Sequence, residues 1–306
     1  MEQTLDEQST TVTAKPRNGF IAFLLSLLLP GLGQVYNGQL KKAVLFFCLL
    51  LLFPLLFAVI HGTTFFYGLL SLLVIEFALR IYIIIDGVNN AKRQKEYILK
   101  PYNTWYYHLL IAVGMLTVLM VFDTRTILGT QTFKIPTPSN NPTFQLGDWL
   151  VANMRAYKNN EPDYGDIVVF SRPDGQTYTF RVVGRPNDKI ELVDNIVSIN
   201  GKPSIARFIK ETTNDEIPVV EFEEELPNGH KHLIYKYKQP YDSTKTNIKN
   251  IVVPSDSYYL LGDNRDNAAD SRYEGFVSKD RIKGRIIYSY WGRTGVNRMN
   301  IDFTDK

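Results

Sequence analysis

GDNRDNAADSR, residues 262–272, is the stretch from which the fold and the class of this chain can be worked out. Five of its side chains are charged, three more are amides or a hydroxyl, and an apolar run at 258–261 precedes it. Carboxylates and amide oxygens accept the hydrogen bonds that a forked guanidinium donates, so such side chains can interlock. A loop rich in these residues is usually a solvated turn. The segments that accompany it favour a structured loop instead.

Three further segments, in a set order along the chain, match the family that this loop resembles. They are PTPSNNPT at 136–143, GDIVVF at 165–170 and YTFRVVG at 178–184, and the loop is followed by Gly275-Phe276-Val277 and Gly284-Arg285. Together they resemble type I signal peptidases, which are membrane-anchored serine endopeptidases that remove signal peptides from translocated precursor proteins with a Ser–Lys pair. The matched part runs roughly from Lys134 to Trp291. The resemblance implies a mainly antiparallel β domain with a coiled or barrel-like sheet.

Short β-branched and aromatic runs, separated by turn residues, independently favour antiparallel β structure after residue 125. Asn200-Gly201 and Pro227-Asn228-Gly229 are typical of hairpin turns. We expect strands at 149–152, 167–170, 178–183, 189–193, 196–199, 218–222, 231–237, 251–253, 258–261 and 285–290. Residues 202–250 separate the matched segments and are interpreted as an insert or cap, in which His230 and His232 are expected to face solvent.

Composition divides the chain into three parts. They are a polar N-terminal tail at 1–19, an apolar region at 20–122 and the predicted β domain at 123–306. Pro30-Gly31 breaks the first apolar run, so the sequence leaves open whether segment 20–36 crosses a membrane or re-enters it. Residues 30–42 resemble the small Pro-Gly-Leu-Gly-Gln membrane modules found in varied proteins, and this resemblance implies no mechanism.

The apolar region is expected to form three to four membrane helices. The runs 43–60 and 105–122 each contain 18 residues without a charge, the minimum for a membrane-spanning helix. The run 64–85 is also long enough but contains Glu76 and Arg80. Their i,i+4 spacing puts both side chains on one helix face, where they can neutralise each other.

Positive charge between the apolar runs predicts the orientation of this region. The cations gather in two clusters, which are Lys41 with Lys42, and Lys92, Arg93, Lys95 and Lys100. Placing both clusters in the cytoplasm satisfies the positive-inside rule and puts the β domain outside the cytoplasm. The resemblance then implies a multi-pass protein of a bacterial-type inner membrane, whose partners are membrane lipid and signal-peptide-bearing precursors.

Other chemistries find little support in the residues. A net charge of +3 is too small to indicate a nucleic-acid partner, and the sequence shows neither a phosphate-cradling glycine loop nor a cluster of metal ligands. We therefore expect no cofactor and no metal. The single cysteine, Cys48, cannot form an intramolecular disulfide and is expected to be a small buried apolar side chain.

A Ser–Lys protease needs a hydroxyl nucleophile and an amine whose pKa is lowered from about 10.4, so that it can accept a proton. The resemblance places the nucleophile at Ser139 and assigns the Thr137 hydroxyl to the oxyanion hole. Phe180, which has no proton-accepting atom, occupies the family's lysine position, and Ala268 replaces the serine that supports the lysine. Losing both groups is self-consistent, because losing the amine alone would leave a polar group unpaired at a cost of roughly 1–3 kcal/mol.

The charged side chains that flank these positions are expected to form an ion-pair scaffold. They are Arg181, Asp263, Arg265, Asp270 and Arg272. Pro138 stands where the family has a glycine, and Asn140 where it has a methionine that helps shape the membrane-facing surface. Lys134 and Lys189 are conceivable substitute bases. Two functions remain open, a signal peptidase I-like membrane endopeptidase and a catalytically silent homologue that binds signal peptides or membrane-protein partners, so enzymatic activity is left undecided.

Overall fold

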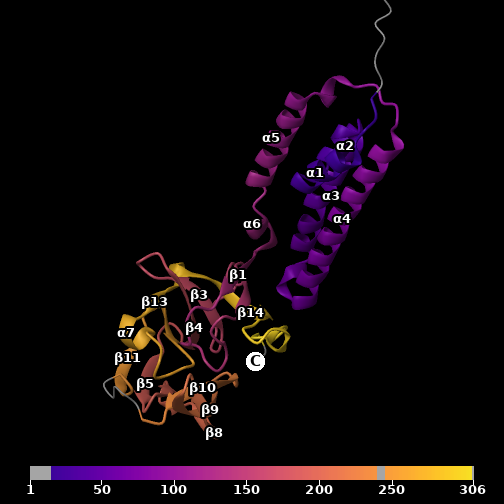
Figure 1. Cartoon of the computed structure of the whole chain (residues 1–306). Helices are drawn as coiled ribbons and strands as arrows, with labels where there is room; N and C mark the ends of the chain where they lie inside the picture. Colours follow the sequence, from indigo (N-terminus) through magenta and orange to yellow (C-terminus); the bar gives the residue numbers. More distant parts are fainter. Residues whose placement is uncertain (1–14, 240–244, 305–306) are drawn as a thin grey trace, which may run out of the picture. The chain divides into compact units, whose positions relative to one another are not determined.

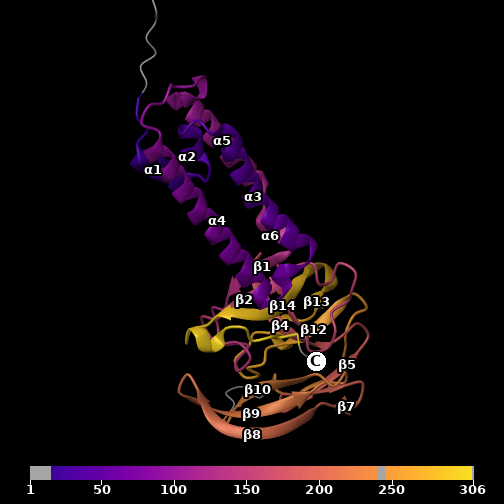
Figure 2. The ribbon, with the colours of Figure 1, turned by 90° about the vertical axis from the view of Figure 1, so that its right-hand side faces the viewer.

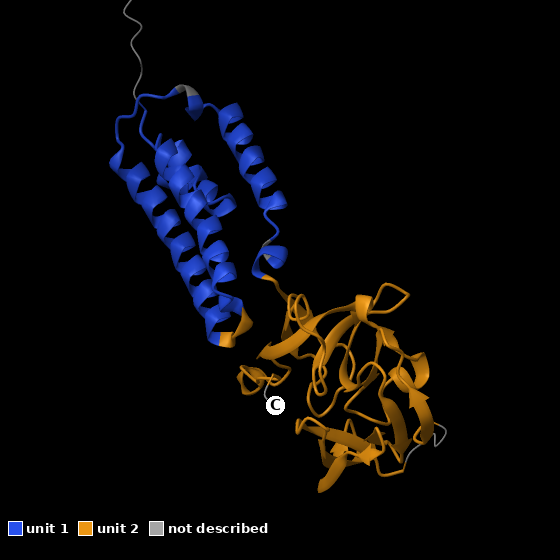
Figure 3. Ribbon diagram, turned by 180° about the vertical axis from the view of Figure 1, so that it is seen from behind, with its two compact units in different colours: residues 1–63, 67–128 blue, residues 64–66, 129–306 orange. Residues whose placement is uncertain are grey.

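The computed structural model describes residues 15–239 and 245–304 of the chain. Residues 1–14 of the predicted polar tail lie outside this range. The chain divides into two compact units (Figure 3), one with residues 1–63 and 67–128 and the other with 64–66 and 129–306. Helices make up the first unit, and strands dominate the second.

The helical unit is built from apolar helices joined by short turns (Figure 1). Its helices are α1 (Gly19–Leu28), α2 (Leu32–Tyr36), α3 (Leu40–Val59), α4 (Phe66–Arg93), α5 (Trp105–Val121) and α6 (Thr124–Leu128), with 3₁₀ turns η1 (Gly62–Thr64) and η2 (Pro101–Asn103). By length and composition, α3 and α4 are the two described helices able to cross a membrane, and α1 and α5 are shorter apolar helices of 10 and 17 residues.

The first apolar run is two helices rather than one. α1 ends at Leu28, and Gly31 takes the left-handed conformation with φ of 104°, which glycine adopts without steric cost. Ten helical residues extend about 15 Å, roughly half the thickness of a bilayer's hydrocarbon core. α1 alone is therefore too short to span a membrane.

The Pro-Gly-Leu-Gly-Gln module is a tight joint between helices. A Cβ atom on Gly33 would lie 2.0 Å from Ser26 Oγ, so only glycine fits where α2 crosses α1. The neighbouring Gln34 is fully buried, and its Nε2 donates to the main-chain oxygen of Ile83 on α4 at 2.7 Å. The module thus fixes α2 against α1 and α4.

One sequence-based expectation for the helical unit is wrong. Glu76 and Arg80 attract each other across one helix face, as expected, and Lys42 on α3 forms an ion pair with Asp86 on α4. Cys48 lies on the exposed side of α3, because helical periodicity turns it away from the buried face of that helix.

The second unit consists of three antiparallel sheets. The strand orders are β1-β2-β14-β3-β4-β12-β13, β10-β9-β8 and β11-β5-β6-β7. The strands are β1 (Thr130–Lys134), β2 (Trp149–Asn153), β3 (Ile167–Ser171), β4 (Thr177–Gly184), β5 (Lys189–Val193), β6 (Ile196–Ile199), β7 (Lys202–Pro203), β8 (Ile205–Asn214), β9 (Ile217–Glu225), β10 (Lys231–Tyr237), β11 (Ile248–Val252), β12 (Ser257–Leu261), β13 (Val277–Ser278) and β14 (Ile282–Trp291). One helix, α7 (Ser271–Glu274), and the 3₁₀ turns η3 (Lys279–Arg281) and η4 (Val296–Arg298) accompany them.

The antiparallel β structure expected from the sequence is confirmed, since every strand pairing within the sheets is antiparallel. Each of the ten expected runs overlaps a strand, while β1, β7, β8 and β13 were not expected. The interpreted insert contains a sheet of its own, in which β8, β9 and β10 lie side by side (Figure 2). Strands β3, β4 and β12 contribute residues to one buried apolar cluster. Phe180 and Ala268 both belong to this cluster.

Candidate functional site

Ser139 lies on the loop between β1 and β2, and the segment 262–272 holds that loop in place. The main-chain N–H of Asn264 donates to the carbonyl oxygen of Ser139 at 3.1 Å. The Asn264 side-chain amide donates to the carbonyl of Pro138, also at 3.1 Å. Asn264 is fully buried, so these two bonds are shielded from water and fix the backbone on which the serine hydroxyl is carried.

Ser139 lines a cleft of about 310 Å³. Thr137 lines the same cleft, and its Oγ1 donates a hydrogen bond to Ser139 Oγ at 3.3 Å. The cleft is walled by residues from the β1–β2 loop, from β4 and its approach, and by Arg172 and Ala269. The sequence-predicted nucleophile and oxyanion residues are therefore neighbours.

Phe180 and Ala268 meet beside Ser139 at one glycine. A Cβ atom on Gly262 would lie 2.4 Å from Ala268 Cβ, 2.6 Å from the Ser139 carbonyl oxygen and 3.3 Å from a ring carbon of Phe180. The Phe180 side chain is 3% exposed, and its ring centroid is 6.0 Å from that of Phe170. Hydrocarbon thus fills the space around Gly262, next to the serine backbone.

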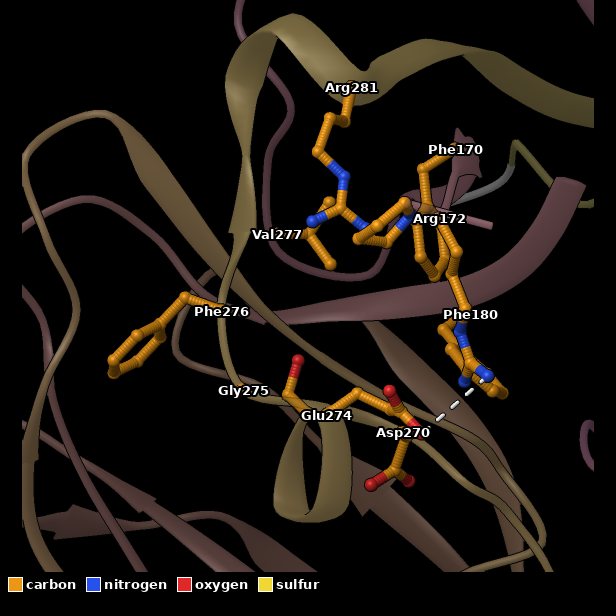
Figure 4. Close-up of a pocket in the computed structure, with 11 residues that line it drawn as sticks. Phe170, Arg172, Phe180, Asp270, Glu274, Gly275, Phe276, Val277 and Arg281 are labelled. Carbon is orange, nitrogen blue, oxygen red and sulfur yellow. Dashed lines mark ion pairs between the residues drawn. The ribbon is translucent and has the colours of Figure 1, made fainter. Parts of the chain in front are cut away.

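Arg172 lines the same cleft as Phe180. Figure 4 shows its guanidinium reaching past the Phe180 ring, with the dashed line marking its ion pair to Glu274. The guanidinium carbon also lies 3.8 Å from the centroid of the Tyr178 ring. Arginine stays protonated at physiological pH, so Arg172 supplies positive charge to the cleft wall and no base.

Asn140 is buried rather than placed on a membrane-facing surface. Its side chain is 5% exposed, and Nδ2 donates to the main-chain oxygen of Thr179 at 2.7 Å and to Thr179 Oγ1 at 3.3 Å. Thr179 precedes Phe180 on β4. The amide therefore joins the nucleophile loop to the strand that carries the aromatic ring.

The scaffold arginines divide into separate buried ion pairs. Arg181 binds Asp263 through two parallel hydrogen bonds, Nε to Oδ1 at 2.8 Å and Nη2 to Oδ2 at 2.6 Å. Arg272 binds Asp270 in the same forked manner at 2.8 and 2.7 Å. Burial opposes ionisation of Asp263, but the Arg181 charge and its hydrogen bonds hold the pKa of that carboxyl below its usual range.

Arg265 finds its partner in the segment that the sequence marked as an insert. Its guanidinium is fully buried and pairs with Glu224 on β9. The backbone of β10 also hydrogen-bonds residues 262–272, which we call the signature loop. Tyr235 N donates to Asp263 O and Arg265 N donates to Tyr235 O, both at 2.9 Å. The three-stranded sheet is therefore part of the scaffold beneath the cleft.

The expectation that His230 and His232 face solvent is wrong. They are 6% and 7% exposed, and their rings stack at 5.7 Å. Arg181 Nη1 donates to His230 Nε2 at 3.1 Å, and burial, with the Arg181 charge, lowers the pKa of His230 to about 4. The period-two alignment of both histidines with Ile234, which is fully buried, was the sequence signal that pointed inward.

The two conceivable substitute bases lie in different places. Lys134 ends β1 and lines the cleft together with Ser139, and its Nζ is 5.7 Å from the centroid of the Trp149 ring. Lys189 starts β5 in the four-stranded sheet and is not among the residues that line the cleft.

The second unit is an antiparallel β structure that carries neighbouring serine and threonine hydroxyls in one cleft. Comparison with protein families identifies the group to which it belongs. The model of the family described as signal peptidase, peptidase S26, matches residues 104–291, and the chain belongs to this family.

Curated relatives are named as signal peptidases. Signal peptidase I of Rickettsia conorii is 32% identical over 212 residues, covering 57% of this chain and 79% of the relative. The probable signal peptidase I-2 of Synechocystis sp. is 28% identical, with 67% and 80% covered, and signal peptidase IB of Staphylococcus aureus is 28% identical, with 60% and 87% covered. A crystal structure of a signal peptidase I from Enterococcus faecalis aligns at 25% identity with a TM-score of 0.25, covering 41% of this chain and 97% of that one.

Proposed function

We propose that this signal peptidase I-like chain receives signal-peptide-bearing precursors in the Ser139 cleft and does not cleave them by the Ser–Lys route. One observation carries the proposal, namely that the Phe180 ring and the Ala268 methyl group occupy the space around Gly262, beside Ser139. Neither group can accept the proton that a serine must lose to become a nucleophile. The cleft is thereby suited to recognition rather than to this chemistry.

The hydroxyl pair still has a binding role that needs no base. Thr137 donates to Ser139 Oγ, so the Ser139 proton remains available to a carbonyl oxygen in the cleft. A peptide segment in the cleft would be held by this hydroxyl, between the β1–β2 loop and β4. Arg181, Asp263, Asp270 and Arg272 act as structural support at this cleft and not as reacting groups.

We further propose that the helical unit is a multi-pass membrane region and that the β unit lies outside the cytoplasm. The two long apolar helices support insertion, and the lysines and arginines at one end of the unit support the orientation through the positive-inside rule. The boundaries of the three parts are those of the composition shifts near residues 19 and 122. Such a placement presents the cleft to chains that have crossed the membrane.

A second candidate function is endoproteolysis with Lys134 as a relocated base. Its placement in the same cleft as Ser139 favours this reading. The position of its Nζ, 5.7 Å from the centroid of the Trp149 ring, opposes it, because a cation–π contact holds the side chain at that ring. Lys134 would have to leave that ring to accept a proton from Ser139.

Cleavage of a signal-peptide substrate by the full chain in detergent separates these functions. We expect no turnover by wild type beyond that of Ser139→Ala, and we expect turnover at least about 100-fold higher from Phe180→Lys combined with Ala268→Ser, the order that a positioned general base supplies. Turnover by wild type that both Ser139→Ala and Lys134→Ala abolish would establish the relocated base and overturn the proposal.

Binding is measured in parallel with the same fluorescent signal peptide. Wild type, Ser139→Ala and Lys134→Ala should all bind it, with Ser139→Ala weakened by the loss of one hydrogen bond, roughly 0.5–1.5 kcal/mol. Absence of binding by wild type would reject the recognition function outright.

A further inference from the structure

One end of the helical unit carries a concentration of positive charge that the Ser139 cleft does not use. Its members, which we call the basic face, are Lys15, Arg17, Lys92, Arg93, Lys95 and Lys100. Within segments 15–19 and 92–105 the one acidic residue is Glu96. The segments meet at the same end of the unit (Figure 1), where the chain enters α1, leaves α4 and approaches α5.

Main-chain and side-chain contacts hold the basic face together. Lys15 N donates to Tyr97 O at 3.1 Å, and Arg17 N donates to Gln94 O at 3.0 Å, so the chain entering α1 pairs with the chain leaving α4. A Cβ atom on Gly19 would lie 3.2 Å from Lys92 Cγ, which places the stem of that lysine beside the start of α1. The cations are therefore gathered by structure and not only by sequence.

Arg17 is the member of this face with the most restricted geometry. Its guanidinium carbon lies 4.4 Å from the ring centroid of Tyr36 and 4.2 Å from that of Tyr97. Nε and Nη2 are buried and have no hydrogen-bond partner among the described residues. The buried guanidinium of Arg181, by contrast, is paired with a carboxylate. Arg17 is thus a planar cation held between two rings, and no carboxylate of residues 15–239 or 245–304 is seen to pair with it.

The Pro-Gly-Leu-Gly-Gln module explains how this arrangement arises. Tyr36 ends α2, and the Gly38 carbonyl that follows accepts hydrogen bonds from Tyr102 Oη at 2.7 Å and Lys100 Nζ at 3.2 Å. A Cβ atom on Gly38 would lie 1.8 Å from Tyr97 Oη, so glycine is needed for Tyr97 to reach this position. The module thus assembles the two rings on either side of Arg17.

We propose that the basic face binds the phosphate of an anionic phospholipid headgroup, with Arg17 at its centre. The fixed guanidinium places a positive charge at the centre of the face, and the surrounding lysines add to the field that attracts anionic lipids. Trp105, 76% exposed at the start of α5, is the kind of side chain that sits at headgroup depth. The inference rests on the proposed membrane insertion and not on the chemistry at Ser139.

Native mass spectrometry of the full chain in detergent, with equal phosphatidylglycerol and phosphatidylcholine, tests this site. Wild type should retain phosphatidylglycerol preferentially, and Arg17→Gln should weaken that retention about fivefold, as expected for one charge removed near a lipid surface. Arg17→Lys should fall between the two, because it keeps the charge and loses the planar group that lies over the Tyr36 and Tyr97 rings. Arg207→Gln, the same change at an exposed position on β8, is the matched control and should change nothing.

Three outcomes would overturn the proposal. These are equal retention of both lipids by wild type, equal effects of Arg17→Gln and Arg207→Gln, and displacement of phosphatidylglycerol by soluble glycerol phosphate, which would identify a site for free phosphate. Lys92→Gln removes another charge of the basic face without disturbing the tyrosine rings. It should also weaken retention of phosphatidylglycerol, so the test does not depend on correct folding of the Arg17 variants. Signal-peptide binding is measured on the same samples, so a failure at the cleft leaves the lipid result intact and the reverse also holds.

Discussion

Asn140 illustrates how a single polar side chain can alter a familiar loop. In the structure its amide bridges to Thr179, so the residue after Ser139 is tied to the residue before Phe180. The neighbouring Ser139 carbonyl is held by Asn264. The serine is thus fixed from two sides by amides, although no amine stands beside it around Gly262.

Replacing Asn140 by leucine should loosen this loop. The partly buried Thr179 carbonyl would lose this donor, so we expect the free energy of unfolding to fall by roughly 1–3 kcal/mol. Thermal unfolding of the full chain in detergent measures the change. Asn159→Leu, at an exposed position, is the control, and equal midpoints for the two variants would contradict a clamp at Asn140.

At the scale of elements, the three-stranded sheet is joined to the signature loop through a buried charge. Glu224 on β9 is fully buried and pairs with Arg265. Burial alone would raise the pKa of Glu224, but the Arg265 charge and the contacts with His232 hold that pKa well below its usual range. Removing the negative charge would leave Arg265 buried without compensation.

Glu224→Gln should therefore destabilise the full chain by about 3–5 kcal/mol, the range for a broken buried ion pair. Glu223→Gln, one residue earlier on the same strand and only partly buried, should cost less than about 0.5 kcal/mol. The measurement is the unfolding midpoint of both variants. A small effect of Glu224→Gln would show that water or another group reaches Arg265.

The stacked histidines predict a pH dependence of stability. Burial lowers the pKa of His230 to about 4 from an unfolded value of about 6.5, so the stability of the neutral form is complete above pH 6.5 and declines as the pH falls toward 4. We expect a loss of about 2 kcal/mol between pH 7 and pH 5. Arg181, Asp263 and His232 face the ring; the pKa of Asp263 is lowered, so Asp263 loses its contribution only below about pH 4.

His230→Gln isolates this contribution. The variant keeps an acceptor for Arg181 but does not titrate, so its unfolding free energy should depend less on pH between 7 and 5 than that of wild type. His232, whose pKa is also lowered by burial and by Arg181, retains the remaining dependence. Parallel curves for the two proteins would exclude His230 as the titrating group.

Local sequence patterns predicted most of the strands, but they could not predict contacts between residues that are far apart in the sequence. The alternating and aromatic runs identified β2 to β6, and the signature loop identified the family. β8 was missed because most of its residues are exposed and polar, which removes the alternation that marks a strand. The Arg265–Glu224 pair depends on β9 lying beneath the loop, and no spacing in the sequence encodes that approach.

At the scale of the whole molecule, the proposed orientation makes a direct prediction about accessibility. With Cys48→Ser as background, Lys202→Cys should react with a membrane-impermeant maleimide in intact cells, because Lys202 is exposed on the β unit. Lys95→Cys should react only after the membrane is permeabilised. Labelling of Lys95→Cys in intact cells would contradict the proposed orientation and place this end of the helical unit outside the cytoplasm.

The bond between Tyr235 and the signature loop has a consequence for shortening the protein. Excising residues 202–239 would remove Glu224, the counter-charge of Arg265. It would also remove Tyr235, the main-chain hydrogen-bond partner of both Asp263 and Arg265. The damage would reach Ser139 through Asn264, which sits between those two residues. Evolution or engineering can dispense with this sheet only by rewriting the loop that rests on it.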